Sequence, residues 1–294
     1  MQLVAWLLRR AFMFFVFLAT GGCWAPDPSP PPKDPSRWIF RDPDHLPPLL
    51  LVAHADVVVK GRLATFEDTL VRFPATPGAP QNTAYQVGEL IVAAVLHGPK
   101  AERLRVGIIP DLVDADGKII QYGEDPAALR GKDALFFLRR HHTGQFYQTD
   151  HRSYFLLTGP DQDAELEKEC QRLVRLTADV KKSLQAADER DRLTTAAILL
   201  YRYRCNLDLV RKTEPIDAEE STLILDALAG VSWAGRQADP ETLVHPQDLF
   251  ALLQIGGWVP PPKEPAPDLE ANAKRWLAEN RKNYRITRYV RPEK

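Results

Sequence analysis

The fold of this 294-residue chain is decided in the stretch DVVVKGRLATF, residues 56–66. β-Branched residues dominate its first half, and such a run is typical of a β-strand. Working outward, the chain holds further strand-like runs at residues 83–96, 103–108, 134–138, 146–147 and 154–157. The apolar residues 49–55, just before the first run, are compatible with a short helix. Short strands separated by turn residues predict a small antiparallel barrel or sandwich over residues 49–160.

Residues 161–294 carry the 3.6-residue periodicity of helices instead. Leu166, Cys170 and Leu173 share one helical face, which extends to Leu184. Further helices are predicted to begin at capping or first-turn residues, namely Asp188, Asp217, Pro246 and Asp268. The alternation of residues 284–291 permits a C-terminal strand. No fixed repeat period is visible, so the sequence predicts an α+β protein in which the β domain is followed by an irregular all-α domain.

The first 25 residues have the three parts of an export signal. Arg9 and Arg10 precede the apolar run AFMFFVFLA, residues 11–19, and the small residues TGG lead to Cys23. The apolar run is too short to cross a bilayer comfortably, because a membrane-spanning helix needs about 20 residues. We therefore expect an exported protein.

Cys23 sharpens this expectation. A cysteine that follows two glycines at the end of the apolar run resembles the lipobox of bacterial lipoproteins, although Thr20 stands where that family usually has Leu. The resemblance implies that Cys23 is diacylated, becomes the mature N-terminus and anchors the chain to a membrane of the cell envelope, facing the periplasm. The alternatives are a soluble secreted protein cut near Ala25 and an uncleaved anchor that also uses residues 3–8.

Residues 26–48 are rich in proline and suit a tether between the anchor and the folded part. Many of the chain's 25 prolines fall in this segment. Proline-rich chains favour extended polyproline II conformation, which would hold a folded domain away from its anchor.

The β domain resembles known secreted modules. The segments ADVVVKGR (residues 55–62), VLHGP (95–99) and GKDALFFL (131–138) follow one another as in uncharacterised exported bacterial proteins. The same order of elements is similar to netrin-like and tissue-inhibitor-of-metalloproteinase modules, and this resemblance implies an OB-type five-stranded barrel. The inhibitors depend on an N-terminal cysteine bonded to the barrel, and residues 49–160 contain no cysteine. Inhibition of metalloproteinases is therefore not implied.

Cys170 and Cys205 are the two cysteines that remain if Cys23 is acylated. An oxidising compartment favours their pairing. Their midpoint lies between Ala187 and Asp188, where we expect the turn of a helical hairpin, and residues equidistant from such a turn lie side by side. This reasoning predicts a Cys170–Cys205 disulfide, worth roughly 3–4 kcal/mol in the chain-entropy treatment. The alternative is two buried free thiols.

Candidate metal ligands are few. His141, His142 and His151 flank an expected hairpin at Thr143 and Gly144. Adjacent strand residues point to opposite faces, so at most two of the three imidazoles can converge. Metal sites need three or four ligands. We therefore expect solvated hairpin histidines, with metal binding as the weaker alternative, and we expect no cofactor.

The sequence predicts a binding protein rather than an enzyme. No hydrolase, metalloprotease or nucleotide-binding motif is present, so no catalytic residue is assigned. The net charge of −1 argues against nucleic acid as a partner. The primary expectation is a non-enzymatic envelope lipoprotein whose barrel binds a ligand or an envelope protein. One alternative is a hydrolase with its site in the cleft between the domains, and another is a structural subunit of an envelope complex.

Overall fold

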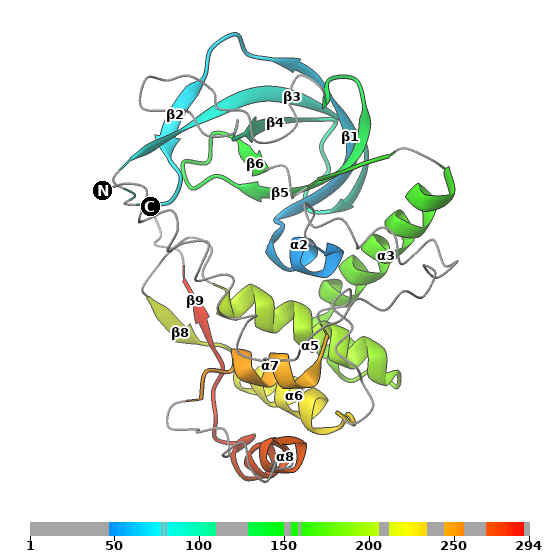
Figure 1. The fold of residues 1–294 in the computed structure, drawn as a ribbon, viewed down its shortest axis with the longest axis vertical. Coiled ribbons are helices and arrows are strands. Elements are labelled where there is room, and N and C mark those ends of the chain that lie inside the picture. Colours follow the sequence, from blue (N-terminus) through cyan, green and yellow to red (C-terminus); the bar gives the residue numbers. More distant parts are fainter. Residues whose placement is uncertain are drawn as a thin grey trace, which may run out of the picture. The chain divides into compact units, whose positions relative to one another are not determined.

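The structure is a computed structural model. It describes residues 47–77, 79, 81–109, 129–149, 154–157, 160–205, 212–233, 244–255 and 269–290, all within the unit Asp34–Lys294. These residues form a mixture of strands and helices (Figure 1).

Five strands close into a ring. β1 (Val57–Phe66) pairs with β3 (Asn82–His97) on one side and with β5 (Asp133–Arg140) on the other. The path of neighbours runs β1-β3-β4-β6-β5 and returns to β1, with β4 at Arg103–Ile108 and β6 at Tyr147–Thr149. The closed ring of strands is visible in Figure 1.

One pairing in the ring is parallel, which corrects the prediction of a wholly antiparallel sheet. β4 and β6 run parallel, and the other four ring pairings are antiparallel. The reason is topological. Strand direction cannot alternate all the way around a closed ring with an odd number of strands, so at least one neighbouring pair must be parallel.

The length and curvature of β3 allow the ring to close. β3 is 16 residues long and pairs with β1, β4 and β2 (Val71–Pro74) along different parts of its length. The β1–β3 register shifts at three places, and such irregularities bend a strand. At Gly61 a Cβ atom would lie 2.4 Å from the Ile91 carbonyl oxygen, so the bend requires glycine there.

The interior of the ring is apolar. Its buried side chains come from all three of the longest ring strands and include Val59, Leu90 and Phe136. The sequence anticipated β1, β3, β4, β5 and β6, and it anticipated β7 (Tyr154–Leu156), which pairs with β5. It missed β2, a short strand that ends in Pro74.

The helices follow the predicted caps where those residues are described. Their bounds are α2 Pro48–His54, α3 Pro160–Ala178, α4 Val180–Leu184, α5 Glu189–Arg204, α6 Ala218–Ala229, α7 Pro246–Leu252 and α8 Leu269–Asn280. The Asp188 carboxylate accepts from the Arg190 amide at 2.8 Å and the Asp217 carboxylate from the Glu220 amide at 3.1 Å, so both caps are confirmed. Asp268 lies outside the described residues. None of the helices in the described ranges combines the length and the apolarity that crossing a membrane requires.

Two elements of the C-terminal half were not predicted in full. The apolar face from Leu166 to Leu184 is divided between α3 and α4, because the Asp179 side chain caps the Lys182 amide at 3.2 Å and starts a new helix. The predicted C-terminal strand is present as β9 (Thr287–Tyr289). Its partner β8 (Thr213–Pro215) was missed.

The helices share a core with the outer face of the ring. Val58, Leu135 and Phe137 belong to the same buried cluster as the helical side chains. The Arg202 guanidinium of α5 donates to the Ala53 carbonyl oxygen at 2.9 Å, which satisfies a backbone acceptor at the end of α2. Helix α2 therefore packs with the helices, although the sequence placed residues 49–55 with the strands.

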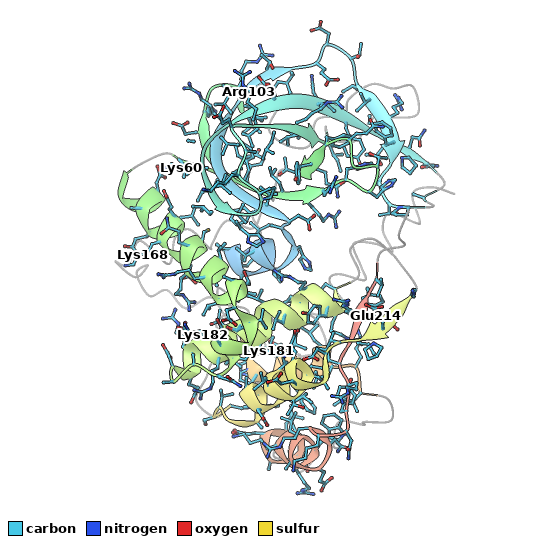
Figure 2. All side chains as sticks on the ribbon, turned by 180° about the vertical axis from the view of Figure 1, so that it is seen from behind. Lys60, Arg103, Lys168, Lys181, Lys182 and Glu214 are labelled. Atoms are coloured by element: carbon cyan, nitrogen blue, oxygen red, sulfur yellow. The ribbon has the colours of Figure 1, made fainter. Side chains whose placement is uncertain are left out.

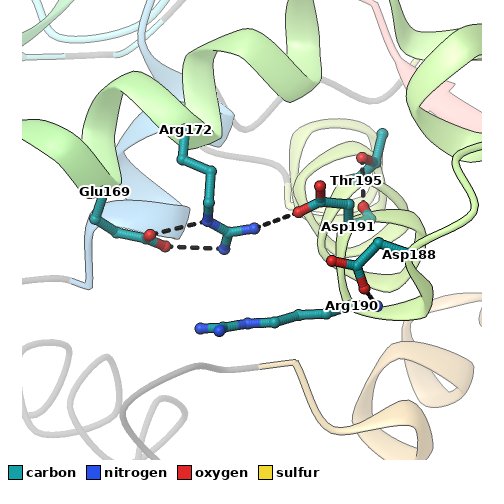
Figure 3. Close-up of polar contacts among 6 residues, drawn as sticks. All are labelled: Glu169, Arg172, Asp188, Arg190, Asp191 and Thr195. Atoms are coloured by element: carbon teal, nitrogen blue, oxygen red, sulfur yellow. Dashed lines mark hydrogen bonds and ion pairs between the residues drawn. The ribbon is translucent and has the colours of Figure 1, made fainter.

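The predicted Cys170–Cys205 disulfide is not formed in this structure, and both cysteines are free. Two residues beyond Cys170, the Arg172 side chain of α3 reaches the first turn of α5, where it donates to Asp191 at 2.6 Å (Figure 3). Cys205 caps the opposite end of α5, whose 16 residues make it roughly 24 Å long at 1.5 Å per residue. The two helices thus meet near one end of α5 instead of forming the symmetric hairpin that the prediction required.

Candidate functional site

A groove of about 480 Å³ lies on the outer side of the first three ring strands. We call it the ion-pair groove. It is lined by Thr65 and Phe66 of β1, by Glu67 after it, by Gly88 and Glu89 of β3, and by Arg103, Leu104 and Arg105 of β4. The sequence alone does not reveal this group of side chains, because only the pairing of strands brings them together.

Four charged side chains, two positive and two negative, line the groove. The Arg103 Nη1 atom lies 2.9 Å from Glu89 Oε2. Glu89 stands directly opposite Arg105 in the β3–β4 register. The Arg105 side chain donates to Glu67 Oε1 through Nε at 3.0 Å and Nη2 at 2.7 Å. Both arginines lie on β4, whereas Glu89 lies on β3 and Glu67 follows β1, and we call these four side chains the charge ladder.

Phe66, at the end of β1 beside the groove, packs against the apolar interior of the ring. Phe66 stands opposite Gly88 in the β1–β3 register, and a Cβ atom on Gly88 would lie 2.8 Å from the Phe66 ring. The Arg130 guanidinium lies over the same ring, 5.7 Å from its centroid. Phe66 is thus fixed between Gly88 and a cation, on the face of the sheet that is directed toward the ring interior.

The chemistry of the groove is that of a contact surface. Its two arginines and two glutamates cancel in charge, so the groove has no preference for a simple anion or cation. The ladder side chains are exposed to solvent, with Arg103 at 66%. Exposed ion pairs contribute only about 0.2–1 kcal/mol each, so they can exchange partners at little cost.

His141 and His142 lie at the predicted hairpin, which joins β5 to β6. They follow β5 in a turn, and their ring centroids lie 4.3 Å apart. His141 is 1% exposed and stacks on Phe146 at 4.6 Å, so the expectation that it is solvated is wrong. Local sequence could not show this, because Phe73 and Tyr85, which also surround the ring, come from β2 and β3.

Protein contacts already use nitrogen atoms of both histidines. His142 Nε2 donates to the Pro74 carbonyl oxygen at 2.7 Å. His141 Nδ1 lies 2.8 Å from the Thr143 hydroxyl, and the Thr143 amide donates to the same nitrogen at 3.3 Å. Within the described ranges no three His, Cys, Asp or Glu side chains are grouped so that they could hold a metal ion. His151 lies outside those ranges, as does Cys23.

A second group of ionisable side chains lies where the ring meets the helices. Burial and the neighbouring Arg202 lower the pKa of His97, and the negative charge of Asp56 partly offsets this decrease. Burial likewise lowers the pKa of Arg202. The Asp56 carboxylate accepts from the Arg140 amide at 2.7 Å, and Arg202 donates to carbonyl oxygens of α2. These contacts hold backbone segments together, so they are explained by the fold.

Comparison with known proteins adds no assignment: no protein-family model matches the chain, and no curated protein matches it.

Proposed function

We propose that this chain is an exported protein, anchored to a membrane of the cell envelope through a lipid on Cys23, and that it binds another protein through the ion-pair groove. It acts without catalysis and without a cofactor. The single observation that carries the binding role is the groove itself, which is lined by two arginines and two glutamates.

The ring supports an OB-type assignment for the β domain. In chain order the ring strands are β1, β3, β4, β5 and β6, and their third and fifth members are the parallel neighbours. OB-type barrels are five-stranded and bind ligands on the face of their second and third strands. In this chain those strands are β3 and β4, which carry Glu89, Arg103 and Arg105 of the charge ladder. Because one fold hosts many functions, the assignment supports the location of the site and not the identity of the ligand.

The residues of the groove favour a protein as its occupant. A small charged ligand would be attracted by an excess of positive or negative charge, and the charge ladder has no such excess. A polypeptide surface offers side chains of both signs. Exposed charges of this kind set specificity and association rate more than affinity, as is usual at protein interfaces.

The anchor and tether fit this role. A lipid on Cys23 and the proline-rich residues 26–48 would hold the folded part near the membrane while leaving the groove free to meet a neighbour. The hydrolase alternative would need a reactive group beside His97, and the structural alternative would need a broad apolar surface. Neither is favoured by a specific observation.

The proposal is tested by photocrosslinking in the bacterium that expresses the full chain. A photoreactive amino acid replaces Thr65 in the groove, and a matched control replaces Glu214 on β8, outside the groove (labelled in Figure 2). We expect a discrete protein adduct from position 65 and none from position 214. Equal labelling from both positions, or no adduct from position 65, would overturn the proposal.

A further inference from the structure

Positive charge is concentrated in the C-terminal part of this chain. Residues 274–294 contain eight Lys or Arg residues and two Glu residues, which gives a net charge of +6. The whole chain carries −1, so residues 1–273 together carry −7. A local excess of one sign attracts partners of the opposite sign.

Three of these cations are held in ion pairs within the fold. Each lies 2.8 Å or less from a carboxylate oxygen, and the pairs are Lys274–Glu270, Arg281–Asp226 and Arg288–Glu214. The second pair fastens the end of α8 to α6, and the third fastens β9 to β8. These three cations are therefore explained by the fold.

Three further cations, Arg275, Lys282 and Arg285, are available to an external partner, and we call them the basic surface. All three are exposed, and none of them forms an ion pair within the described ranges. Glu279 is the one acidic residue between positions 275 and 285, and it is exposed as well. Three positive charges against one negative charge leave a net charge of +2 on this surface.

Arg275 and Lys282 lie on one side of α8. They are seven residues apart, which is about two turns of a helix. Helical hydrogen bonding continues past position 282, because the Tyr284 amide still donates to the Asn280 carbonyl oxygen at 2.8 Å. Leu277, which is buried, lies on the opposite side of the helix by the same periodicity. The fold therefore turns both cations toward solvent.

Aromatic side chains border the basic surface. Trp276 follows Arg275 in the chain and Tyr284 precedes Arg285, and both aromatic residues are half-buried. Their ring centroids lie 5.1 Å apart in an edge-to-face arrangement. Trp and Tyr are enriched where proteins meet the headgroup region of a bilayer, and Lys and Arg are attracted to anionic headgroups.

We propose that the basic surface binds the phosphate groups of anionic phospholipids in the membrane that holds the lipid anchor. The nearness of that membrane rests on the proposed function. Separate cations on the outer side of a helix do not enclose a single small ligand, but they match a plane of phosphate groups. The contact fixes which side of the folded part faces the membrane, which a lipid on a tether alone does not do.

Vesicle binding by the full chain carrying Cys23→Ser tests this surface apart from the lipid. The variant is mixed with vesicles of phosphatidylcholine alone, or of phosphatidylcholine and phosphatidylglycerol in equal parts, and the bound fraction is measured by flotation. We expect binding to the anionic vesicles to be at least about tenfold stronger, because each Lys or Arg near an anionic surface contributes about 1 kcal/mol, or about fivefold. High salt should abolish this preference, since it screens the attraction.

Two matched triple variants in the same background locate the binding. Arg275→Gln/Lys282→Gln/Arg285→Gln should remove the preference for anionic vesicles. The control triple variant removes three exposed cations of the β domain that likewise form no ion pair within the described ranges, as Arg62→Gln/Arg72→Gln/Lys100→Gln, and should keep the preference. Both variants lower the net charge by three, so a difference between them reports position rather than total charge. Circular dichroism shows whether each variant is folded, and the salt dependence tests the attraction without any change at the basic surface.

Three results would overturn the inference: equal binding to the two kinds of vesicle, a preference that survives high salt, or the same loss in both triple variants. None of these results bears on the adduct expected from position 65 or on the lipid at Cys23, so the proposed function would stand. A mature protein without that lipid would refute the proposed anchor, whereas a preference for anionic vesicles that is lost only in the first triple variant would still support the basic surface.

Discussion

The contact between Gly107 and Phe146 allows a sharp test of how the ring is built. Gly107 of β4 lies between Val87 and Gln148 in the sheet, and the Phe146 ring covers it. A Cβ atom on Gly107 would lie 2.4, 2.6 and 3.2 Å from three atoms, all of them in the Phe146 ring. The change Gly107→Ala therefore clashes with one side chain.

The size of the effect follows from this geometry. Overpacking of a buried contact costs about 1–3 kcal/mol, so Gly107→Ala should lower the free energy of unfolding by that amount. Phe146 is 3% exposed, and Phe146→Ala should cost about 3–5 kcal/mol. In the Phe146→Ala background the clash is gone, and alanine in a strand is favoured over glycine by roughly 0.5–1 kcal/mol. The second substitution should then be neutral or stabilising.

Urea unfolding of the four proteins, followed by tryptophan fluorescence and circular dichroism, measures this coupling. Gly131→Ala is the control, because Gly131 has a φ of +75° and no atom lies within 4 Å of the methyl group that alanine would add. Its cost comes from the backbone and should be the same with or without Phe146. If Gly107→Ala were equally destabilising in both backgrounds, the described packing of Phe146 on β4 would be wrong.

Three further outcomes are expected. Burial and Arg202 lower the pKa of His97 from 6.5, so the unfolded state takes up a proton before the folded state as the pH falls. The free energy of unfolding should therefore decrease below about pH 6.5. In urea titrations at several pH values, His97→Gln should make the free energy of unfolding less dependent on pH in this range. Burial raises the pKa of Tyr201 to about 12. The contribution of this shift to the free energy of unfolding is complete below about pH 10 and is lost as the pH rises toward about 12. The stability of Tyr201→Phe should therefore be less sensitive to alkali when unfolding is measured across that range. In the folded protein, alkylation followed by peptide mass spectrometry should find the half-buried Cys205 labelled before Cys170, which is 0% exposed, and early labelling of Cys170 would contradict its placement in the core.

The sequence predicted elements well where the signal is local. The β-branched run of β1 and the continuous apolar run of β5 identify their strands because each pattern is complete within a few consecutive residues. The caps Asp188 and Asp217 mark helix starts because the capping bond spans only two or three residues. β2 and β8 were missed because each is a short strand ending in proline, at Pro74 and Pro215, and each depends on a distant partner.

The candidate site could not be predicted, because it exists only across strands. Arg103 and Arg105 were visible as an alternating pair, but the positions of Glu67 and Glu89 beside them depend on the register of three strands. The burial of His141 depends in the same way on Phe73 and Tyr85. The disulfide prediction assumed a symmetric hairpin, whereas in the structure both cysteines are free and α4 stands between α3 and α5 in the chain.

The proposed role depends above all on the anchor, and the intact mass of the mature protein purified from bacterial membranes tests it most directly. The account predicts a mass that begins at Cys23 and carries a diacylglycerol. An unmodified mass that begins elsewhere would contradict the lipid anchor, and with it the role of the membrane in the proposed function.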